Sequence, residues 1–537
     1  FHPEGVALGL HTHSPANMLW TMPVNLLFGM APALNLAIFT GFVMAGLGGY
    51  LLAGQYTHRR LPAFLGGIAA AYFPQHVDQA TEHLNLASYW AMPLFLWALI
   101  RCVRQGGRRW WLATGLFFAL NALFAWHNAL LSIPLGIGVA LFEIWRGSRS
   151  LKSVTVELTA AAAVGLVVMG PFLWPVMRDT LAGSAALQKP FFDRPLAATT
   201  FWLPHPGHPI WGAWLTDLHL ELRSYSSVGS IGYLGFVSLI LAACTLFVGP
   251  GAKTVSTETR HALRRGSRLF WWAAFLFFLI LSLGETMGKI GLPFAWLKGV
   301  LIFGLVRIPN RFLVPAMLAL AVLAAMGADR LAARVSSRRQ GLLIAGLGLA
   351  MLIDYAWLPF PMRERPRPEW LEALAEVPPG TAVLDIPLSH GPPGAFENFL
   401  QTQHGLPIVG GYLASGFRPA RQQLHRHPAL WRVRTPFRPV KAGEVEQSPP
   451  SALREMGVQL VVVHLSRTQQ QIRAMRQSVD RNEPNSYHQV RLFDPKAGLP
   501  RRALDAIRRD LSAAFGEPIH QTPLVEIYRV SSPPEWP

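Results

Sequence analysis

Two carboxylates and two histidines lie close together in the segment from Tyr72 to Asn85. If this segment is helical, Asp78 and Glu82 are four residues apart on one face, with His83 beside them. Two carboxylates so placed raise each other's pKa and can divide the roles of general base and substrate clamp. The alternative is a solvated acidic loop without a chemical role.

The same segment could instead hold a metal ion. His76, Asp78, Glu82 and His83 combine imidazole and carboxylate groups, which suit Zn²⁺ or Mn²⁺. A divalent metal ion is therefore a candidate cofactor, and we expect no other.

A second candidate site is the segment from Leu305 to Phe312, in which Arg307 and Arg311 are four residues apart. Arginine presents a planar set of donors that binds phosphate well. Pro309 favours the start of a helix, and a helix N-terminus at Arg311 adds positive charge. The pattern predicts an anion site. The alternative is a pair of arginines that extend to lipid headgroups.

A third segment, Phe201 to Gly212, mixes His205 and His208 with aromatic residues and prolines. It predicts either an ordered flap that contacts substrate or a rigid irregular loop. Asp354, near the end of the last apolar segment, is either a helix-end residue or a further catalytic candidate.

The composition shows which elements must position these residues. Hydrophobic residues make up 51% of the 537-residue chain and charged residues 15%, whereas soluble domains carry about 25% charged residues. This excludes an ordinary cytosolic enzyme and a disordered protein. No Asp, Glu, Lys or Arg occurs from Gly5 to His58, while Met362–Pro537 holds 22 Lys and Arg and 17 Asp and Glu. The fold class is therefore an α-helical polytopic membrane domain over 1–361, followed by a soluble α/β domain over 362–537.

Ten apolar segments are candidate membrane spans, at roughly 31–53, 62–74, 87–103, 110–126, 128–145, 158–177, 230–248, 269–283, 311–333 and 341–358. The run from 110 to 142 is too long for one span, and Ala125–Asn128 is its expected break. In the soluble domain, strands are expected at 381–386, 458–464 and 524–530, and helices at 369–376, 468–479 and 501–515. This domain shows no catalytic motif, which favours a cap or acceptor-docking module.

Basic residues collect in alternate loops, and this predicts the orientation. One set of short connections carries seventeen Lys and Arg, at 59–60, 101–109, 146–152, 253–268 and 334–339, and the opposite set is poorer. By the positive-inside rule the first set is cytoplasmic, so the candidate site and the C-terminal domain face the periplasm of a bacterial inner membrane. The rule also accounts for most of the net charge of +18, and we expect no nucleic-acid partner.

An external acidic pocket beside a phosphate clamp suits the transfer of a sugar from a lipid-linked phosphate donor. The lipid tail stays in the bilayer, arginines stabilise the phosphate as the glycosidic bond breaks, and a carboxylate accepts the proton of the acceptor hydroxyl. Expected partners are the bilayer, a polyprenyl-phosphate sugar and a glycan, lipid or protein acceptor.

The sequence also resembles the bacterial multi-spanning glycosyltransferases of the GT-C superfamily, which use polyprenyl-phosphate sugars. The resemblance covers most of the chain and rests on five segments in order: Phe1–Gly5, Glu82–Trp90, Leu203–Gly212, Arg307–Phe312 and Gly405–Tyr412.

The resemblance implies an inverting transfer on the periplasmic side, with the main catalytic carboxylate in the first external loop. Only the tail of that loop, with Glu4, is expected to be present, because the sequence begins at Phe1 without the first span. Such a fragment is expected to lack activity if its catalytic carboxylate lies in the missing part. Asp78 and Glu82 match the second external loop, where related enzymes place supporting acids, and Arg307 and Arg311 match the donor-phosphate side.

Two other classes of function stay open. A transporter or flippase of a lipid-linked or polar substrate predicts an internal repeat and broken spans in corresponding halves, and we find no convincing repeat. A non-catalytic scaffold would use its external domain to bind a partner. Glycosyl transfer predicts that the acids and the arginines meet in one outward-facing pocket.

Overall fold

The structure, a computed structural model, describes residues 14–147, 149–181, 198–205, 207–215, 218, 231–248, 258–284, 293–300, 303, 306, 308–360, 368–375, 377–386, 388, 395–411, 453–464, 508–523 and 525–530. The chain divides into two compact units. One consists of Thr12–Pro175 and Pro190–Arg363 and is called the helical unit, and the other contains Glu364–Pro537 and is called the sheet unit.

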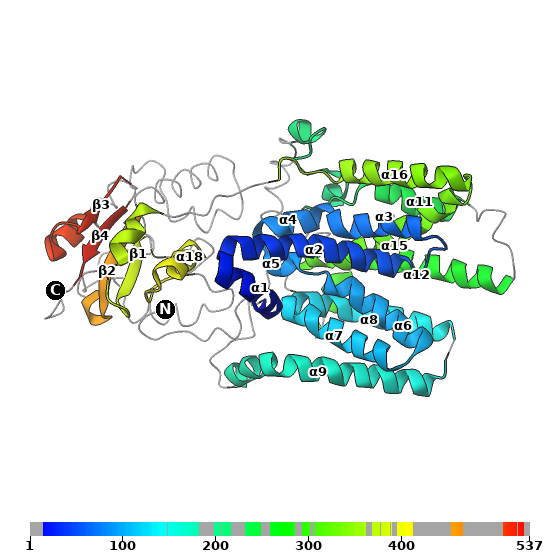
Figure 1. The fold of residues 1–537 in the computed structure, drawn as a ribbon, viewed down its shortest axis with the longest axis horizontal. Coiled ribbons are helices and arrows are strands. Elements are labelled where there is room, and N and C mark those ends of the chain that lie inside the picture. The colour runs from blue at the N-terminus through cyan, green and yellow to red at the C-terminus, as the bar shows by residue number, and fades with distance from the viewer. Residues whose placement is uncertain are drawn as a thin grey trace. The chain divides into compact units, whose positions relative to one another are not determined.

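The helical unit is built from helices that run across the view of Figure 1. Each of the ten predicted apolar segments contains a helix. The helices are α1 (Pro15–Phe28), α2 (Met30–Ala53), α3 (Arg60–Tyr72), α4 (Pro74–Glu82), α5 (Leu84–Ala87), α6 (Ala91–Gln105), α7 (Arg108–Phe124), α8 (Trp126–Trp145), α9 (Leu151–Leu181), η1 (Ala198–Trp202), α11 (Phe236–Phe247), α12 (Glu258–Ser282), α13 (Pro293–Leu297), η3 (Pro309–Phe312), α15 (Leu313–Ala332) and α16 (Ser337–Asp354).

Five of the described helical segments are long and apolar enough to cross a membrane by length and composition. They are Met30–Ala53, Leu84–Gln105, Trp126–Trp145, Leu151–Pro175 and Pro309–Ala332. Phe236–Phe247 and Gly266–Ser282 are shorter apolar helices. These are the helices of a multi-pass membrane protein, and the count of ten spans stays a prediction.

The predicted break in the long apolar run is confirmed. α7 ends at Phe124, Ala125 is extended with φ −162° and ψ 127°, and α8 begins at Trp126. Helix α1 was not predicted. It is uncharged, and Gly29, with φ 85°, separates it from α2. Left-handed backbone of this kind favours glycine, so an apolar run that looks continuous contains two helices.

Close helix packing positions the segment that follows α3. A Cβ on Gly49 of α2 would lie 2.5 Å from the Cβ of Ala70 and 2.8 Å from the carbonyl oxygen of Gly66, both on α3. Small residues let membrane helices approach closely. The segment Pro309–Ala332 consists of η3 and α15, and 94% of its apolar stretch is buried. It packs against α3 and α2.

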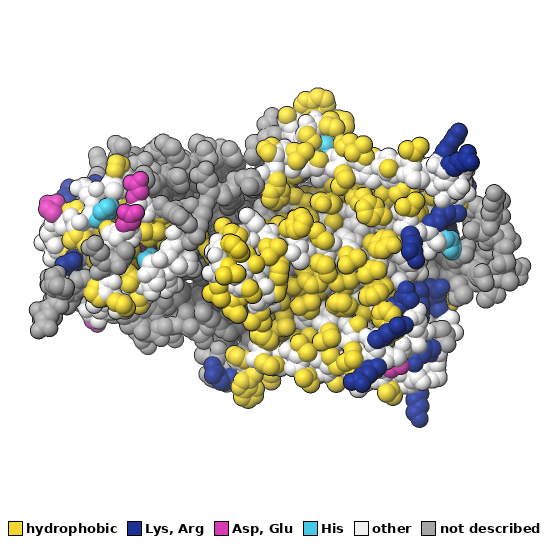
Figure 2. All heavy atoms as spheres, viewed as in Figure 1, with side chains coloured by type: hydrophobic (Ala, Val, Ile, Leu, Met, Phe, Trp, Pro, Cys, Tyr) yellow, Lys and Arg dark blue, Asp and Glu magenta, His cyan; other side chains and the backbone are white. Residues whose placement is uncertain are grey.

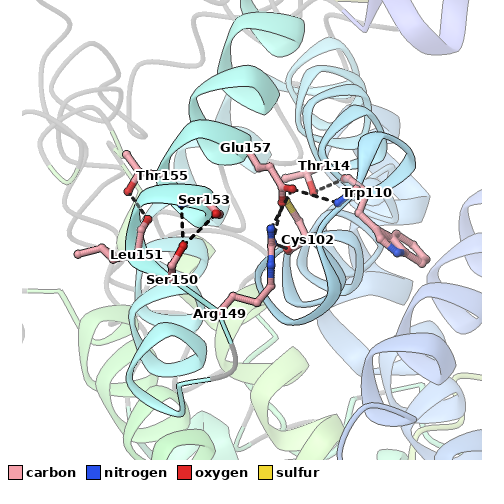
Figure 3. Close-up of polar contacts among 10 residues, drawn as sticks. Cys102, Trp110, Thr114, Arg149, Ser150, Leu151, Ser153, Thr155 and Glu157 are labelled. Carbon is pink, nitrogen blue, oxygen red and sulfur yellow. Dashed lines mark hydrogen bonds and ion pairs between the residues drawn. The ribbon is translucent and has the colours of Figure 1, made fainter.

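Figure 2 shows Lys and Arg gathered at one end of the helical unit. Ion pairs join the basic loops there: Arg59 Nη1 lies 2.9 Å from Asp329 Oδ1, and Arg104 Nε lies 2.7 Å from Glu143 Oε2. In Figure 3, Arg149 reaches Glu157 of α9, with Nη1 2.8 Å from Oε2, next to Cys102 of α6. The alternate basic loops therefore meet at one end, as the charge pattern predicts. Which side of the membrane this end faces stays a prediction.

The sheet unit contains a four-stranded sheet in the order β1-β2-β4-β3. β1 and β2 are parallel, and β4 is antiparallel to β2 and β3. The strands expected at 381–386, 458–464 and 524–530 are present as β1, β2 and β4. The expected helix at 468–479 lies outside the described residues, and that at 501–515 is described only from residue 508. The elements are η4 (Glu369–Leu371), α17 (Glu372–Ala375), β1 (Ala382–Ile386), α18 (Ala395–His404), β2 (Val458–His464), β3 (His520–Gln521) and β4 (Val525–Arg529).

Candidate functional site

The acidic segment is a short helix, α4, which follows α3 after a single residue. Phe73 is extended, with φ −58° and ψ 141°, and Pro74 occupies the first turn of α4. Proline suits this place because the first helical N–H groups have no partner within the helix. The segment is helical from Pro74 to Glu82, which meets the condition under which Asp78 and Glu82 lie on one face.

His76 holds α4 in place. Its Nδ1 lies 2.6 Å from the carbonyl oxygen of Ala71 at the end of α3, and its Nε2 lies 2.9 Å from that of Ala87 at the end of α5. Its ring is buried against Phe42, Phe73 and Tyr89. Burial lowers the pKa of His76 to about 4, against the opposite effect of the two carbonyl groups.

These contacts correct the expectation that His76 is a metal ligand. Both of its ring nitrogens face backbone carbonyl groups, so neither points toward Asp78 or His83. Among the described side chains, no three His, Cys, Asp or Glu residues come together in a way that could hold a metal ion. His76 therefore does not fit the expected metal site, while metal binding by Asp78, Glu82 and His83 stays a prediction, and we derive no step through a metal.

The other face of α4 lies against the turn that carries Arg311. Gln75 Nε2 donates to the carbonyl oxygen of Asn310 over 3.1 Å, across 235 positions of sequence. Asn310 and Arg311 belong to η3, which leads directly into α15. In a helix, positions three, four and seven residues apart share a face. Asp78 and the backbone position of Glu82 thus lie on the same face of α4 as Gln75.

The other residues predicted for this site differ in burial and in whether the structure describes them. Asp78 and Arg311 are half-buried and His83 is exposed at the end of α4. Asp78 Oδ2 accepts a hydrogen bond from Gln79 Nε2 over 3.3 Å. Arg307 and Glu4 lie outside the described residues, as does the side chain of Glu82.

His205 and His208 form a separate cluster against α16. The His205 ring lies over Trp357, with 3.6 Å between centroids. His208 Nε2 lies 2.9 Å from the carbonyl oxygen of Ile353, and its Nδ1 accepts the N–H groups of Ile210 and Trp211. Both nitrogens of His208 are thus engaged in holding the loop. This arrangement favours the rigid irregular loop over a flap that contacts substrate.

Asp354 has a structural place at the same end of α16. Its Oδ2 accepts the N–H of Val237, in the first turn of α11, over 2.9 Å, and its Oδ1 accepts the Tyr233 hydroxyl. A carboxylate at a helix N-terminus satisfies a donor that has no partner within the helix. Asp354 is therefore a helix-end residue, the first of the two alternatives that the sequence left open.

Sequence reasoning missed two residues of the α4 face, Gln75 and Gln79. Both lie within the acidic segment, and the only signal for them was their spacing: Gln75 precedes Asp78 by three residues and Gln79 precedes Glu82 by three. It also missed Asn17 of α1, whose Nδ2 donates to Ser88 Oγ over 2.7 Å and so ties α1 to the end of α5.

Comparison with known proteins places most of the helical unit in one family. Residues 14–356 match the family described as a domain of unknown function (DUF6311). The chain belongs to this family. No curated protein matches the chain.

Two solved structures are similar to the chain at a low level. A crystal structure of ArnT from Cupriavidus metallidurans bound to undecaprenyl phosphate has a TM-score of 0.44 and 12% identity, over 97% of this chain and 88% of that chain. The apo state of the same protein has a TM-score of 0.39 and 12% identity, over 97% and 89%. A likeness of this size carries no inference about activity.

Proposed function

We propose that this protein is a membrane glycosyltransferase that moves a sugar from a polyprenyl-phosphate donor to a glycan, lipid or protein acceptor. The observation that carries the proposal is the hydrogen bond from Gln75 to Asn310, because it joins the acidic face of α4 to the turn that carries Arg311. A general base and a phosphate-binding cation are the two groups that this transfer needs side by side.

The proposed reaction is a single displacement with inversion. The acceptor hydroxyl oxygen attacks the anomeric carbon, and a carboxylate of α4, Asp78 or Glu82, accepts the hydroxyl proton. The bond between the anomeric carbon and the phosphate oxygen breaks, and polyprenyl phosphate leaves with the electron pair. Arg311 stabilises the negative charge that develops on that oxygen, because a guanidinium group forms strong, charge-assisted hydrogen bonds with phosphate.

The remaining roles complete the proposal. Arg307 is proposed to bind the donor phosphate with Arg311, His83 to contact substrate at the exposed end of α4, and Glu4 to supply a further carboxylate. The protein is proposed to reside in the bacterial inner membrane, with this site and the sheet unit on the periplasmic side.

The experiment is a transfer assay with the full chain in liposomes and a panel of polyprenyl-phosphate sugars. Arg311→Ala is expected to lower the transfer rate by about 100-fold or more, the size of effect seen when one preorganised donor to a developing charge is removed. Arg338→Ala is the matched control, because Arg338 is exposed in the first turn of α16 and belongs to the basic set at 334–339. It is expected to transfer at the wild-type rate.

Two results would overturn the proposal. One is an Arg311→Ala protein that folds and transfers sugar as fast as the wild type. The other is a folded wild-type protein that transfers no sugar from any donor of the panel.

A further inference from the structure

The α4 face that meets η3 carries two glutamines one helical turn apart. Gln75 is only 4% exposed, and Gln79 is half-buried. The amide oxygens of both side chains are buried, and within the part of the chain that the structure describes no donor reaches either of them. This pair of buried acceptors lies on the same helix face as Asp78.

The orientation of each amide is fixed by what its nitrogen contacts. Gln75 Nε2 donates to the Asn310 carbonyl oxygen over 3.1 Å, and Gln79 Nε2 donates to Asp78 Oδ2 over 3.3 Å. Exchanging oxygen and nitrogen in either amide would place an acceptor against an acceptor. The two atoms without a partner are therefore oxygens, and the ligand that satisfies them must supply hydrogen-bond donors.

Such a pair is costly for the protein alone. A buried acceptor without a donor costs about 1–3 kcal/mol, and buried polar groups in native proteins are rarely left in this state. Two carbonyl oxygens beside the Asp78 carboxylate repel a phosphate, and a lipid tail has no hydrogen-bond donor for them. Hydroxyl groups on a compact ring supply hydrogen-bond donors at close spacing.

We propose that Gln75 and Gln79 bind hydroxyl groups of the donor's sugar ring, and so select the sugar while Arg311 binds the phosphate. This inference rests on the proposed function, because it divides the same site into a sugar part on α4 and a phosphate part on η3.

The test uses Gln79→Met, since Gln75 also holds η3 in place. Methionine has nearly the same length but no acceptor, so the variant removes the uncompensated oxygen. If Gln79 binds sugar, the variant keeps or raises its melting temperature and yet binds a sugar-bearing donor roughly tenfold more weakly, the effect of about one lost hydrogen bond. If Gln79 only packs, the melting temperature rises and binding stays the same, which overturns the inference.

The binding probes are farnesyl phosphate and farnesyl phosphate linked to glucose, galactose, mannose or arabinose, added to the full chain in nanodiscs. Gln79→Met is expected to weaken binding of the preferred sugar lipid and to leave farnesyl phosphate unchanged. Gln340→Met is the matched control, because the amide of Gln340, in the first turns of α16, donates to the carbonyl oxygen of Ala332 at the end of α15. It is expected to leave both affinities unchanged.

The two proposals fail differently. A wild type that transfers sugar while Gln79→Met binds every probe as tightly as the wild type overturns the sugar contact and leaves the function standing. A wild type that binds a sugar lipid through Gln79 but transfers no sugar overturns the enzyme function and supports the contact. A wild type that binds no sugar lipid more tightly than farnesyl phosphate overturns the sugar contact.

Discussion

At the scale of single residues, His76 determines where the acidic helix lies. Its ring spans the carbonyl groups that end α3 and α5, which places α4 between them. A neutral imidazole donates from one nitrogen only, and protonation of this buried ring is opposed by desolvation. The stability of the site region should therefore depend on pH.

The direction of this pH dependence follows from the pKa of His76. Burial lowers the pKa of His76 from 6.5 to about 4 in the folded protein, so the unfolded chain binds the proton more readily. The stabilisation is present above pH 6.5 and is lost as the pH falls toward 4, by up to about 3 kcal/mol. We expect the melting temperature in detergent to fall between pH 7 and pH 5, and His76→Gln to flatten this dependence. An equally steep fall in His76→Gln would contradict this role.

Asp78, Glu82 and Arg311 could be singled out as candidates from sequence because an ionisable group next to an apolar segment stands out in a membrane protein. The role of His76 could not. A metal ligand and a histidine that caps two helices look alike in sequence, and only the positions of the Ala71 and Ala87 carbonyl groups separate the two cases. Gln75 and Gln79 carry no charge, and their spacing from the acids was their only signal until the orientation of α4 was known.

At the scale of elements, Asp354 shows how an acid that stands out in the sequence can have a structural role. It accepts the Val237 N–H at the start of α11 and the Tyr233 hydroxyl. Asp354→Ala is expected to cost about 2 kcal/mol, the combined size of a lost helix cap and a lost hydrogen bond to a charged group. The melting temperature should fall, while transfer per folded molecule should match the wild type.

Asp354→Asn is the control for this prediction, because its amide oxygen can still accept the Val237 N–H. It should lie between Ala and the wild type in stability. Loss of transfer in a variant that melts at the wild-type temperature would instead show that Asp354 takes part in the reaction.

Element boundaries were predictable where a local signal marks them. The break at Ala125 separates α7 from α8. It was predicted from polar residues in an apolar run, His127 and Asn128, which are followed by Pro134. The end of α1 depends on a single positive φ at Gly29, and glycines also occur inside α2. Composition cannot tell a glycine that ends a helix from one that lets two helices approach.

At the scale of the whole molecule, the distribution of basic residues predicted which loops lie at the same end of the helical unit. The ion pairs Arg59–Asp329 and Arg104–Glu143 join basic connections that are distant in sequence, as the positive-inside pattern requires. Which loops of the other end meet could not be predicted in the same way, because those contacts are made by uncharged groups such as Gln75 and the Asn310 backbone.

The central claim is that α4 and η3, far apart in sequence, form one site. It is tested most directly by cross-linking Gln75→Cys to Asn310→Cys in membranes, in a background where Cys102 and Cys244 are replaced by alanine. The pair Asn85→Cys and Asn128→Cys is the positive control, since the Asn128 side chain donates to the Asn85 carbonyl oxygen over 3.3 Å. The account predicts rapid cross-linking of both pairs by a short bismaleimide. Cross-linking of the control pair alone would contradict it.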